Sequence, residues 1–150
     1  MKRIVIYILA LAAALLVPLR GTDVGKLLPV GLIQLYKEGE NIVIVTDTGD
    51  SGSGSSVQAA FLNLEETTAG VVFLDTADYL LVSRSAEDAV PTLKDYLKPT
   101  VRVCYAEADI DPVQAAEFLE VHRPAVRLKE HGMQNNVQTL SSVNGRLILR

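Results

Sequence analysis

The residues best suited to chemistry lie in one short loop of aspartates, glycines and hydroxyl side chains, residues 46–56. Asp47 and Asp50, with the neighbouring hydroxyl and carbonyl oxygens, offer the hard oxygen ligands that calcium prefers. The loop lacks the alternating acidic residues and the closing bidentate glutamate of an EF-hand loop. We therefore keep Asp47 and Asp50 as metal ligands only in an alternative hypothesis, in which the protein binds a cation. The sequence predicts no catalytic residue, no cofactor-binding residue and no cofactor.

The same loop allows two other chemical interpretations. Backbone amides before a helix can cradle a phosphate, but the loop has no lysine of the Walker kind and its carboxylates would repel an anion. The string Gly49–Gly52 imitates the nucleophile loop of trypsin-like serine proteases, whose histidine and aspartate precede the serine. Both histidines of this chain, His122 and His131, follow it. We interpret residues 49–56 as a flexible strand-to-helix connection in which a serine caps the helix.

Further carboxylates lie where loops are expected to follow or separate strands. Loops after neighbouring strands of an α/β sheet often meet, so these residues can form a carboxylate pair or a cation site. Aspartate is also frequent in helix caps and turns, and we favour that structural interpretation. The residues are Asp75, Asp78, Glu107, Asp109 and Asp111. His122 is expected to cap the carboxyl end of a helix, where the helix dipole favours a basic side chain.

Cys104 is the only cysteine of the chain. It excludes a disulfide within the chain and a cysteine-based zinc cage. Its neighbours alternate as in a strand, with Val101, Val103 and Tyr105 on one face and Cys104 with Arg102 on the other. We expect Cys104 to be a buried structural residue, because an inert thiol packs as a small apolar side chain.

These residues are positioned by alternating strand and helix patterns. Two apolar runs joined by the turn-like residues 37–40 predict a hairpin of strands 30–36 and 41–46, and helical spacing predicts a helix from Ser55 or Ser56 to about Thr67. Residues 71–74 and 79–82 form either two strands or one bulged strand. Later elements are a helix from Ser85 to about Leu97, a strand 101–106, a helix from Pro112 to about residue 123 capped by Asp111, a short strand 126–128, an irregular stretch 129–142 and an edge strand 146–150. The fold class predicted is α/β, with α+β as the alternative, in which three helices pack on a mixed sheet.

The first twenty residues carry a membrane-targeting signal. Lys2 and Arg3 precede an apolar run, Ile4–Leu19, that has no charged residue. Residues 1–20 are either a signal-anchor helix or a cleaved signal peptide, and the bulky Leu19 before Arg20 disfavours cleavage there. The basic pair orients the chain so that residues 21–150 form one extracytoplasmic domain, with the membrane as partner through residues 4–19. If the signal is cleaved, the domain is secreted.

The rest of the chain is acidic. Residues 20–150 carry a net charge near −6 and contain no cluster of lysine or arginine. Such a surface repels a phosphate backbone, so the sequence predicts no nucleic-acid partner. About 130 residues are enough for one core and too few for two.

The middle of the chain resembles a known family. Residues 52–64 place a glycine-rich turn before a helix with Gln58, Ala59, Asn63 and Leu64, and residues 71–82 follow as a strand pair. Residues 86–97 and the arginine-containing strand 101–107 complete a pattern that resembles the N-terminal domain of GerC-type spore germination proteins, over roughly residues 40–121. The resemblance implies a non-enzymatic subunit of nutrient-receptor complexes at the outer face of the spore inner membrane.

Proteins of that family are held at the membrane by a lipid on an N-terminal cysteine, whereas no cysteine directly follows the apolar run here. We therefore expect the apolar helix to replace the lipid. The expected function is that of a membrane-anchored extracytoplasmic protein that binds other germination-complex proteins or a ligand. The alternative is a small exported enzyme or a cation-binding protein that uses its acidic loop residues.

Overall fold

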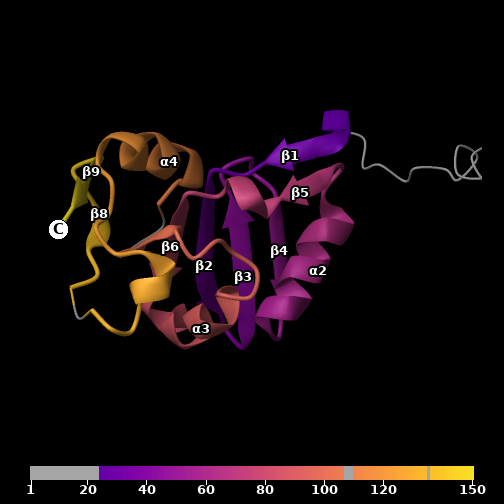
Figure 1. The fold of residues 1–150 in the computed structure, drawn as a ribbon, viewed down its shortest axis with the longest axis horizontal. Coiled ribbons are helices and arrows are strands. Elements are labelled where there is room, and N and C mark those ends of the chain that lie inside the picture. Colours follow the sequence, from indigo (N-terminus) through magenta and orange to yellow (C-terminus); the bar gives the residue numbers. More distant parts are fainter. Residues whose placement is uncertain (1–23, 107–109, 135) are drawn as a thin grey trace, which may run out of the picture.

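The computed structural model describes residues 24–106, 110–134 and 136–150 of the 150-residue chain. Its main sheet has seven strands in the order β4-β3-β2-β6-β7-β8-β9, and β1 and β5 form a separate two-stranded sheet (Figure 1). The strands are β1 (Leu27–Pro29), β2 (Leu32–Glu38), β3 (Asn41–Thr46), β4 (Ser51–Gly54), β5 (Val71–Phe73), β6 (Tyr79–Ser83), β7 (Arg102–Ala106), β8 (Thr139–Val143) and β9 (Arg146–Leu149). The α-helices are α2 (Val57–Thr67), α3 (Val90–Leu93) and α4 (Pro112–Val121). Short 3-10 helices are η1 (Val24–Lys26), η2 (Leu74–Thr76), η3 (Arg84–Ala89) and η4 (Leu128–Glu130).

The main sheet is mixed. Strands β2, β6, β7 and β8 are parallel, whereas β3 and β4 at one edge and β9 at the other run antiparallel to their neighbours. The α/β prediction and the β2–β3 hairpin are therefore confirmed. No helix among the described residues is long and apolar enough to cross a membrane. The predicted anchor, residues 4–19, lies outside the described residues.

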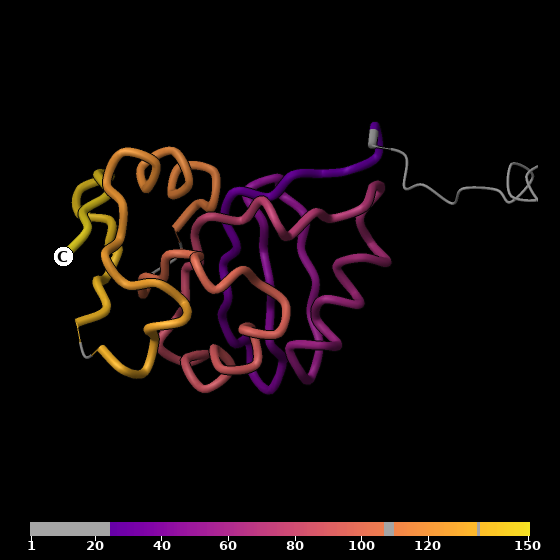
Figure 2. Tube along the Cα trace, viewed as in Figure 1, coloured from indigo at the N-terminus to yellow at the C-terminus, as the bar shows by residue number. Residues whose placement is uncertain are grey.

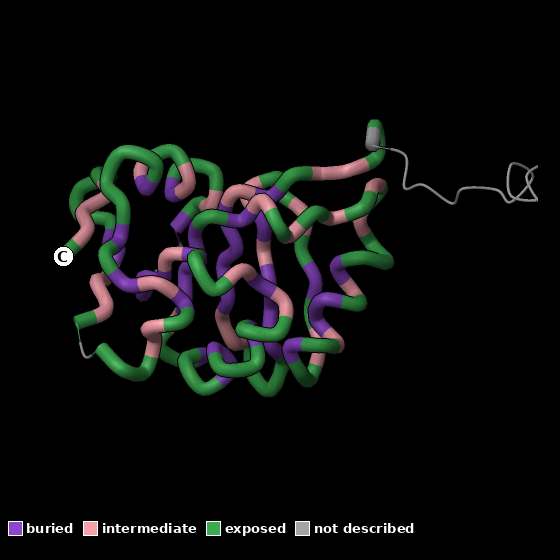
Figure 3. The backbone as a smooth tube through the Cα atoms, viewed as in Figure 1, coloured by how far each residue is buried: buried purple, intermediate pink, exposed green. Residues whose placement is uncertain are grey.

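Two apolar layers cover the two faces of the sheet (Figure 3). On one face, α2 and the η3–α3 segment pack against alternate residues of the strands, including Ile33, Leu80 and Val103. On the other face, α4 packs through Ala115 and Leu119. Because successive strand side chains point to opposite faces, β7 contributes Val103 and Tyr105 to the first layer and Cys104 to the second.

The prediction of a flexible connection at residues 49–56 is wrong over half of its length. Residues 51–54 form the edge strand β4, which pairs with β3 from Ile42↔Gly54 to Val45↔Ser51. Glycine is needed there because α2 lies directly on the strand: a Cβ on Gly52 would come within 2.3 Å of the Ala60 carbonyl oxygen. The predicted cap is confirmed, since the Ser56 side chain accepts a hydrogen bond from the Ala59 amide.

The two predicted strands after α2 are both present, but they belong to different sheets. Strand β5 pairs in parallel with β1, which the sequence analysis did not predict, and β6 joins the main sheet between β2 and β7. The tube in Figure 2 shows β1 and β5 side by side although they are far apart in the sequence. A single bulged strand is therefore excluded.

The predicted helix from Ser85 to Leu97 is only partly correct. It consists of the 3-10 helix η3, the four-residue helix α3 and further turns to Leu97. Pro91 sits at the start of α3 and lacks the amide that would continue the hydrogen bonding from η3, so the helix restarts there. The predicted cap by Ser85 is not present, because its hydroxyl bonds instead to that of Ser83 at 2.9 Å.

The C-terminal part is more regular than predicted. Residues 126–128 form an antiparallel bridge with β7, Arg102↔Arg127, rather than a full strand. The predicted irregular stretch 129–142 is wrong at its end, where β8 pairs with β7 and then with β9. The edge strand at 146–149 is confirmed. Asn144 and Gly145, with φ of 53° and 75°, form the two-residue turn between β8 and β9.

Candidate functional site

Asp47 and Asp50 are engaged in the turn between β3 and β4. Both carboxylate oxygens of Asp47 lie 3.1 Å from the Gly31 amide, and a Cβ on Gly31 would lie 2.8 Å from one of them. Asp50 accepts from the Thr48 hydroxyl at 2.8 Å, and its carbonyl accepts from the Thr46 amide. Among the described residues, no group of three or more histidine, cysteine or acidic side chains could hold a metal ion.

The other predicted acids are divided between opposite edges of the sheet. Asp78 precedes β6 at the amino edge of the parallel strands, where its carboxylate lies 3.5 Å from the Lys98 ammonium. Asp111 follows β7 and caps α4 by accepting from the Val113 amide at 2.9 Å. Asp75 lies in η2, and Glu107 and Asp109 lie outside the described residues. Parallel strands place the start of β6 and the end of β7 at opposite edges, so Asp78 and Asp111 are not brought together.

Cys104 and His122 have structural positions. Cys104 is fully buried beneath the α4 layer, as predicted, and burial raises the pKa of its thiol to about 12. His122 is the C-cap residue of α4, as predicted, but the cap hydrogen bond is donated by its backbone amide to the Phe118 carbonyl. Its ring packs on Phe118 with centroids 4.4 Å apart. The Cys104 thiol, with its raised pKa, is therefore protonated and unreactive at neutral pH as long as the domain stays folded.

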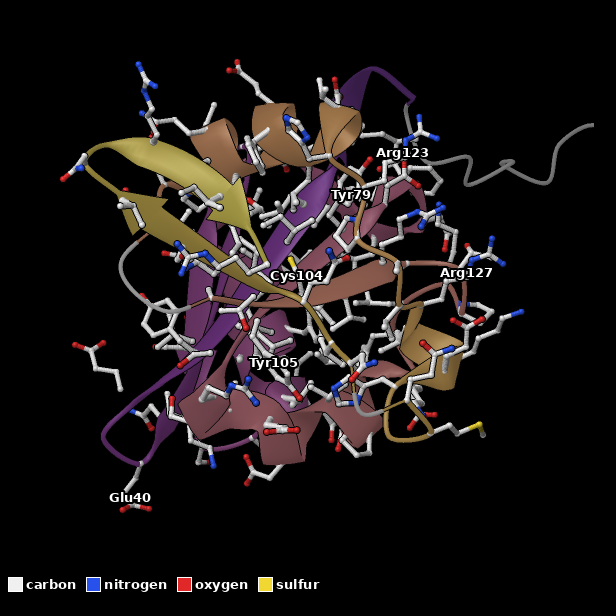
Figure 4. All side chains as sticks on the ribbon, turned by 90° about the vertical axis from the view of Figure 1, so that its left-hand side faces the viewer. Glu40, Tyr79, Cys104, Tyr105, Arg123 and Arg127 are labelled. Carbon is white, nitrogen blue, oxygen red and sulfur yellow. The ribbon has the colours of Figure 1, made fainter. Side chains whose placement is uncertain are left out.

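A different set of polar side chains converges at the carboxyl edge of the parallel strands, where α/β sheets commonly bind ligands. It comprises Arg84, Glu87, Tyr105 and His131, which we call the Tyr105 cluster. In Figure 4, Tyr105 lies toward the same edge as Glu40 in the β2–β3 turn, whereas Tyr79 and Arg123 lie at the opposite edge.

Each residue of the cluster is positioned by its own element. Arg84 and Glu87 lie three residues apart in η3, and a 3-10 helix with three residues per turn places both on one side. Tyr105 is buried and belongs to the face of β7 that meets η3 and α3. His131 ends η4, and its amide donates to the carbonyls of Arg127 and Leu128.

The contacts link all four side chains. The Tyr105 hydroxyl donates to Glu87 Oε1, and it lies 3.4 Å from His131 Nε2. The Arg84 guanidinium carbon lies 3.8 Å from the centre of the Tyr105 ring, a cation–π arrangement. Arg84 and Glu87 are exposed and Tyr105 is buried, so the Tyr105 side chain extends from the core and contacts residues at the surface.

Burial and neighbouring charge set the protonation states. Burial, reinforced by the hydrogen bond to Glu87, raises the pKa of Tyr105 to about 12. Burial lowers the pKa of His131, helped by the Lys94 ammonium and opposed by Glu87. At neutral pH the cluster therefore presents a protonated phenol, a largely neutral imidazole and a guanidinium.

These side chains line a hollow of about 340 Å³, together with Gly132, Gln134 and Val137. The guanidinium and amide supply donors, and the imidazole and amide oxygen supply acceptors. A phenol with a pKa of about 12 is a weak proton donor at pH 7, and none of these lining residues is a serine, threonine or cysteine. The arrangement suits the binding of a small polar group better than it suits nucleophilic catalysis.

Two other hollows are less suited to a site. The hollow of about 650 Å³ between α2, α3 and the β2–β3 turn is wide, and its lysine is paired, Lys37 to Asp88 at 2.8 Å. The pairing with Lys37 lowers the pKa of Asp88. At the amino edge, a hollow of about 290 Å³ brings Asp47 and Asp78 together with Arg123, but the Asp47 carboxylate already accepts from Gly31.

The sequence alone does not reveal the cluster. Tyr105 is predicted only as a strand residue, His131 only as a histidine in the wrong order for a protease, and Glu87 only as part of the segment 86–97. Arg84 has no predicted role. The spacing of three residues between Arg84 and Glu87, directly after a buried strand, is the one local signal. It becomes informative only once η3 is known to be a 3-10 helix.

The lowered pKa of His131 predicts a pH dependence of stability. The unfolded chain takes up a proton near pH 6.5, whereas the folded chain takes it up at lower pH, so unfolding binds a proton in between. The contribution of His131 is therefore present above pH 6.5 and is lost as the pH falls through the folded value. Urea unfolding between pH 7.5 and 5.5 should show a smaller loss of stability in His131→Asn than in the wild type. Equal slopes in the two proteins would contradict the assignment.

Comparison with protein-family models, with curated protein sequences and with solved structures finds no match to this chain.

Proposed function

We propose that the protein is a membrane-anchored, extracytoplasmic binding protein of the kind represented by GerC-type germination receptor subunits, and that it works through contacts rather than through turnover. The Tyr105 cluster is the site we propose for a small ligand or for a polar group of a partner protein. The helix at residues 4–19 would hold the domain at the membrane.

The proposal is supported by how the residues of the family resemblance pack: the glycine-rich segment lies directly against helix α2. Ser56 caps α2, and the Asn63 side chain accepts a hydrogen bond from the Ser53 amide of β4 at 3.0 Å. Leu64 and the backbone of Ala60 lie directly on Gly52. The glycine-rich turn and the helix motif thus form one packing unit, β4–α2, which supports a likeness at the level of fold.

The first test concerns the anchor. Full-length protein should sediment with membranes, and Ala13→Arg should release much of it, because a charge at mid-helix costs about 2.5–3.5 kcal/mol on insertion scales. Ala13→Leu, the matched control, should remain bound. A mature N-terminus between Ala12 and Asp23 would show instead that the segment is a cleaved signal.

The second test concerns the receptor context. Loss of the gene should slow nutrient-triggered spore germination and leave vegetative growth unchanged, and the full chain should restore the rate. If the deletion leaves the germination rate unchanged, the proposal is contradicted.

A second candidate, a small exported enzyme or cation-binding protein, is favoured by one observation: Asp47 and Asp78 line the same hollow at the amino edge. We expect millimolar calcium to leave the melting temperature of the protein nearly unchanged, because Asp47 is committed to the Gly31 amide. A clear rise in melting temperature, abolished by Asp47→Asn with Asp50→Asn, would favour cation binding.

A further inference from the structure

The small β1–β5 sheet has two unlike faces. Its register pairs Leu27 with Val71 and Pro29 with Phe73, and paired residues of neighbouring strands share a face. The middle pair, Leu28↔Val72, is on the opposite face, where Val72 packs against the main core. The outward side therefore carries four apolar residues, which we call the outer β1–β5 face: Leu27, Pro29, Val71 and Phe73.

This face is open to solvent. Val71 is 46% exposed and Phe73 is 37% exposed, whereas most large apolar residues of the described chain are buried. Figure 3 shows β1 and β5 only in the intermediate and exposed classes. Side chains of this kind gathered on one side of a short sheet mark a contact surface rather than scattered exposure.

The position of the face in the chain indicates what covers it. The apolar run ends at Leu19, and β1 begins at Leu27. Seven residues separate them, a span of at most about 28 Å when fully extended. Figure 1 places β1 and β5 at one end of the molecule, away from β8, β9 and the C-terminus.

We infer that the outer β1–β5 face lies against the lipid surface and inserts Phe73 and Val71 at the boundary between headgroups and acyl chains. This inference rests on the membrane anchoring proposed above. Lys26 precedes β1 and Asp75 follows β5, so the segments that flank these strands in the sequence, η1 and η2, carry one charge of each sign. The contact therefore depends on apolar burial and needs no anionic lipid.

The chain contains no tryptophan, so a single introduced tryptophan reports its own surroundings. Full-length Phe73→Trp is reconstituted into phosphatidylcholine vesicles with and without lipids brominated near the start of the acyl chain. We expect a blue-shifted emission and loss of about half the fluorescence with the brominated lipid, as for an aromatic side chain at the interface. Val71→Trp should give the same result. This second variant shows whether the effect depends on a structural disturbance caused by the substitution at position 73.

Met133→Trp is the matched control, because Met133 is 83% exposed and belongs to the segment after η4. The orange-yellow trace of that segment lies at the lower left in Figure 1, on the other side of the molecule from β1. Its emission should stay red-shifted and should not respond to brominated lipid. Flotation of the full-length protein with vesicles measures the anchoring separately. If the protein does not float, both the proposed anchoring and this lipid contact are refuted.

If Phe73→Trp and Val71→Trp both float but their fluorescence is not quenched, the anchoring stands and only the lipid contact of the outer β1–β5 face is refuted. A blue shift without quenching would also overturn it, since it would identify a protein surface as the occupant.

Discussion

Replacing Gly52 by alanine is expected to destabilise the domain by about 3 kcal/mol or more, beyond the usual cost of an extra methyl group in a packed core. The new Cβ would lie 2.3 Å from the Ala60 carbonyl oxygen and 2.4 Å from the Leu64 amide nitrogen. Both are backbone atoms in the middle of α2 and cannot rotate away. The helix must lift off the strand, and the apolar residues beneath it lose their contacts.

Urea unfolding followed by circular dichroism measures the effect. Ser53→Ala supplies the control, since its side chain is on the exposed side of β4 and its backbone bond to Asn63 is kept. We expect that control to stay within about 0.5 kcal/mol of the wild type. If Gly52→Ala were equally harmless, the close packing of α2 on β4 would be wrong.

Leu64→Ala is expected to lower the free energy of unfolding by about 2–5 kcal/mol, a large part of the total stability of a domain of this size. Leu64 is fully buried in the layer between α2 and the sheet, and alanine would leave a cavity that the strands cannot close. Leu62, two residues earlier on the same helix, is 52% exposed.

Leu62→Ala therefore makes the same chemical change outside the core and should cost less than about 0.5 kcal/mol. The comparison of the two variants cancels the difference in helix propensity between leucine and alanine. Similar losses at both positions would mean that α2 presents another face to the sheet.

The main elements of the fold were predictable where local chemistry and tertiary packing agree. The apolar runs of β2 and β3 on either side of a turn-like segment, and the helical spacing of Val57, Ala60, Phe61 and Leu64, led to the correct strands and helix. The cap at Ser56 and the pair Asp111–Pro112 fixed the beginnings of α2 and α4.

Strand β4 and strand β8 were not predicted, for different reasons. The sequence of β4, Ser51–Gly54, has low strand propensity, and it forms a strand because β3 pairs with it and α2 packs on it. Strand β8 had a local signal: Asn144-Gly145 is the preferred type of two-residue hairpin turn, and the sequence analysis overlooked it.

The candidate site could not be predicted because its contacts are distant in sequence. Tyr105 meets Glu87 and His131 only after β6 and β7 have paired and η4 has folded back against β7. The acids that the sequence singled out are spread along the chain in loops, and the parallel order of β6 and β7 sends them to opposite edges.

In the part of the chain that the structure describes, few backbone pairs join the C-terminal hairpin to the sheet. Between the described residues, β8 pairs with β7 at Tyr105↔Thr139 and Ala106↔Leu140, whereas β6 and β7 share five pairs. We expect this hairpin to detach in a local opening that costs less free energy than unfolding of the whole chain, so that its amides exchange with solvent at that lower free energy. Leu140 belongs to the same apolar layer as Cys104, so the departure of β8 removes part of the cover over the thiol. Because Cys104 is the single cysteine, the rate at which a thiol reagent labels the protein should report how often the hairpin opens.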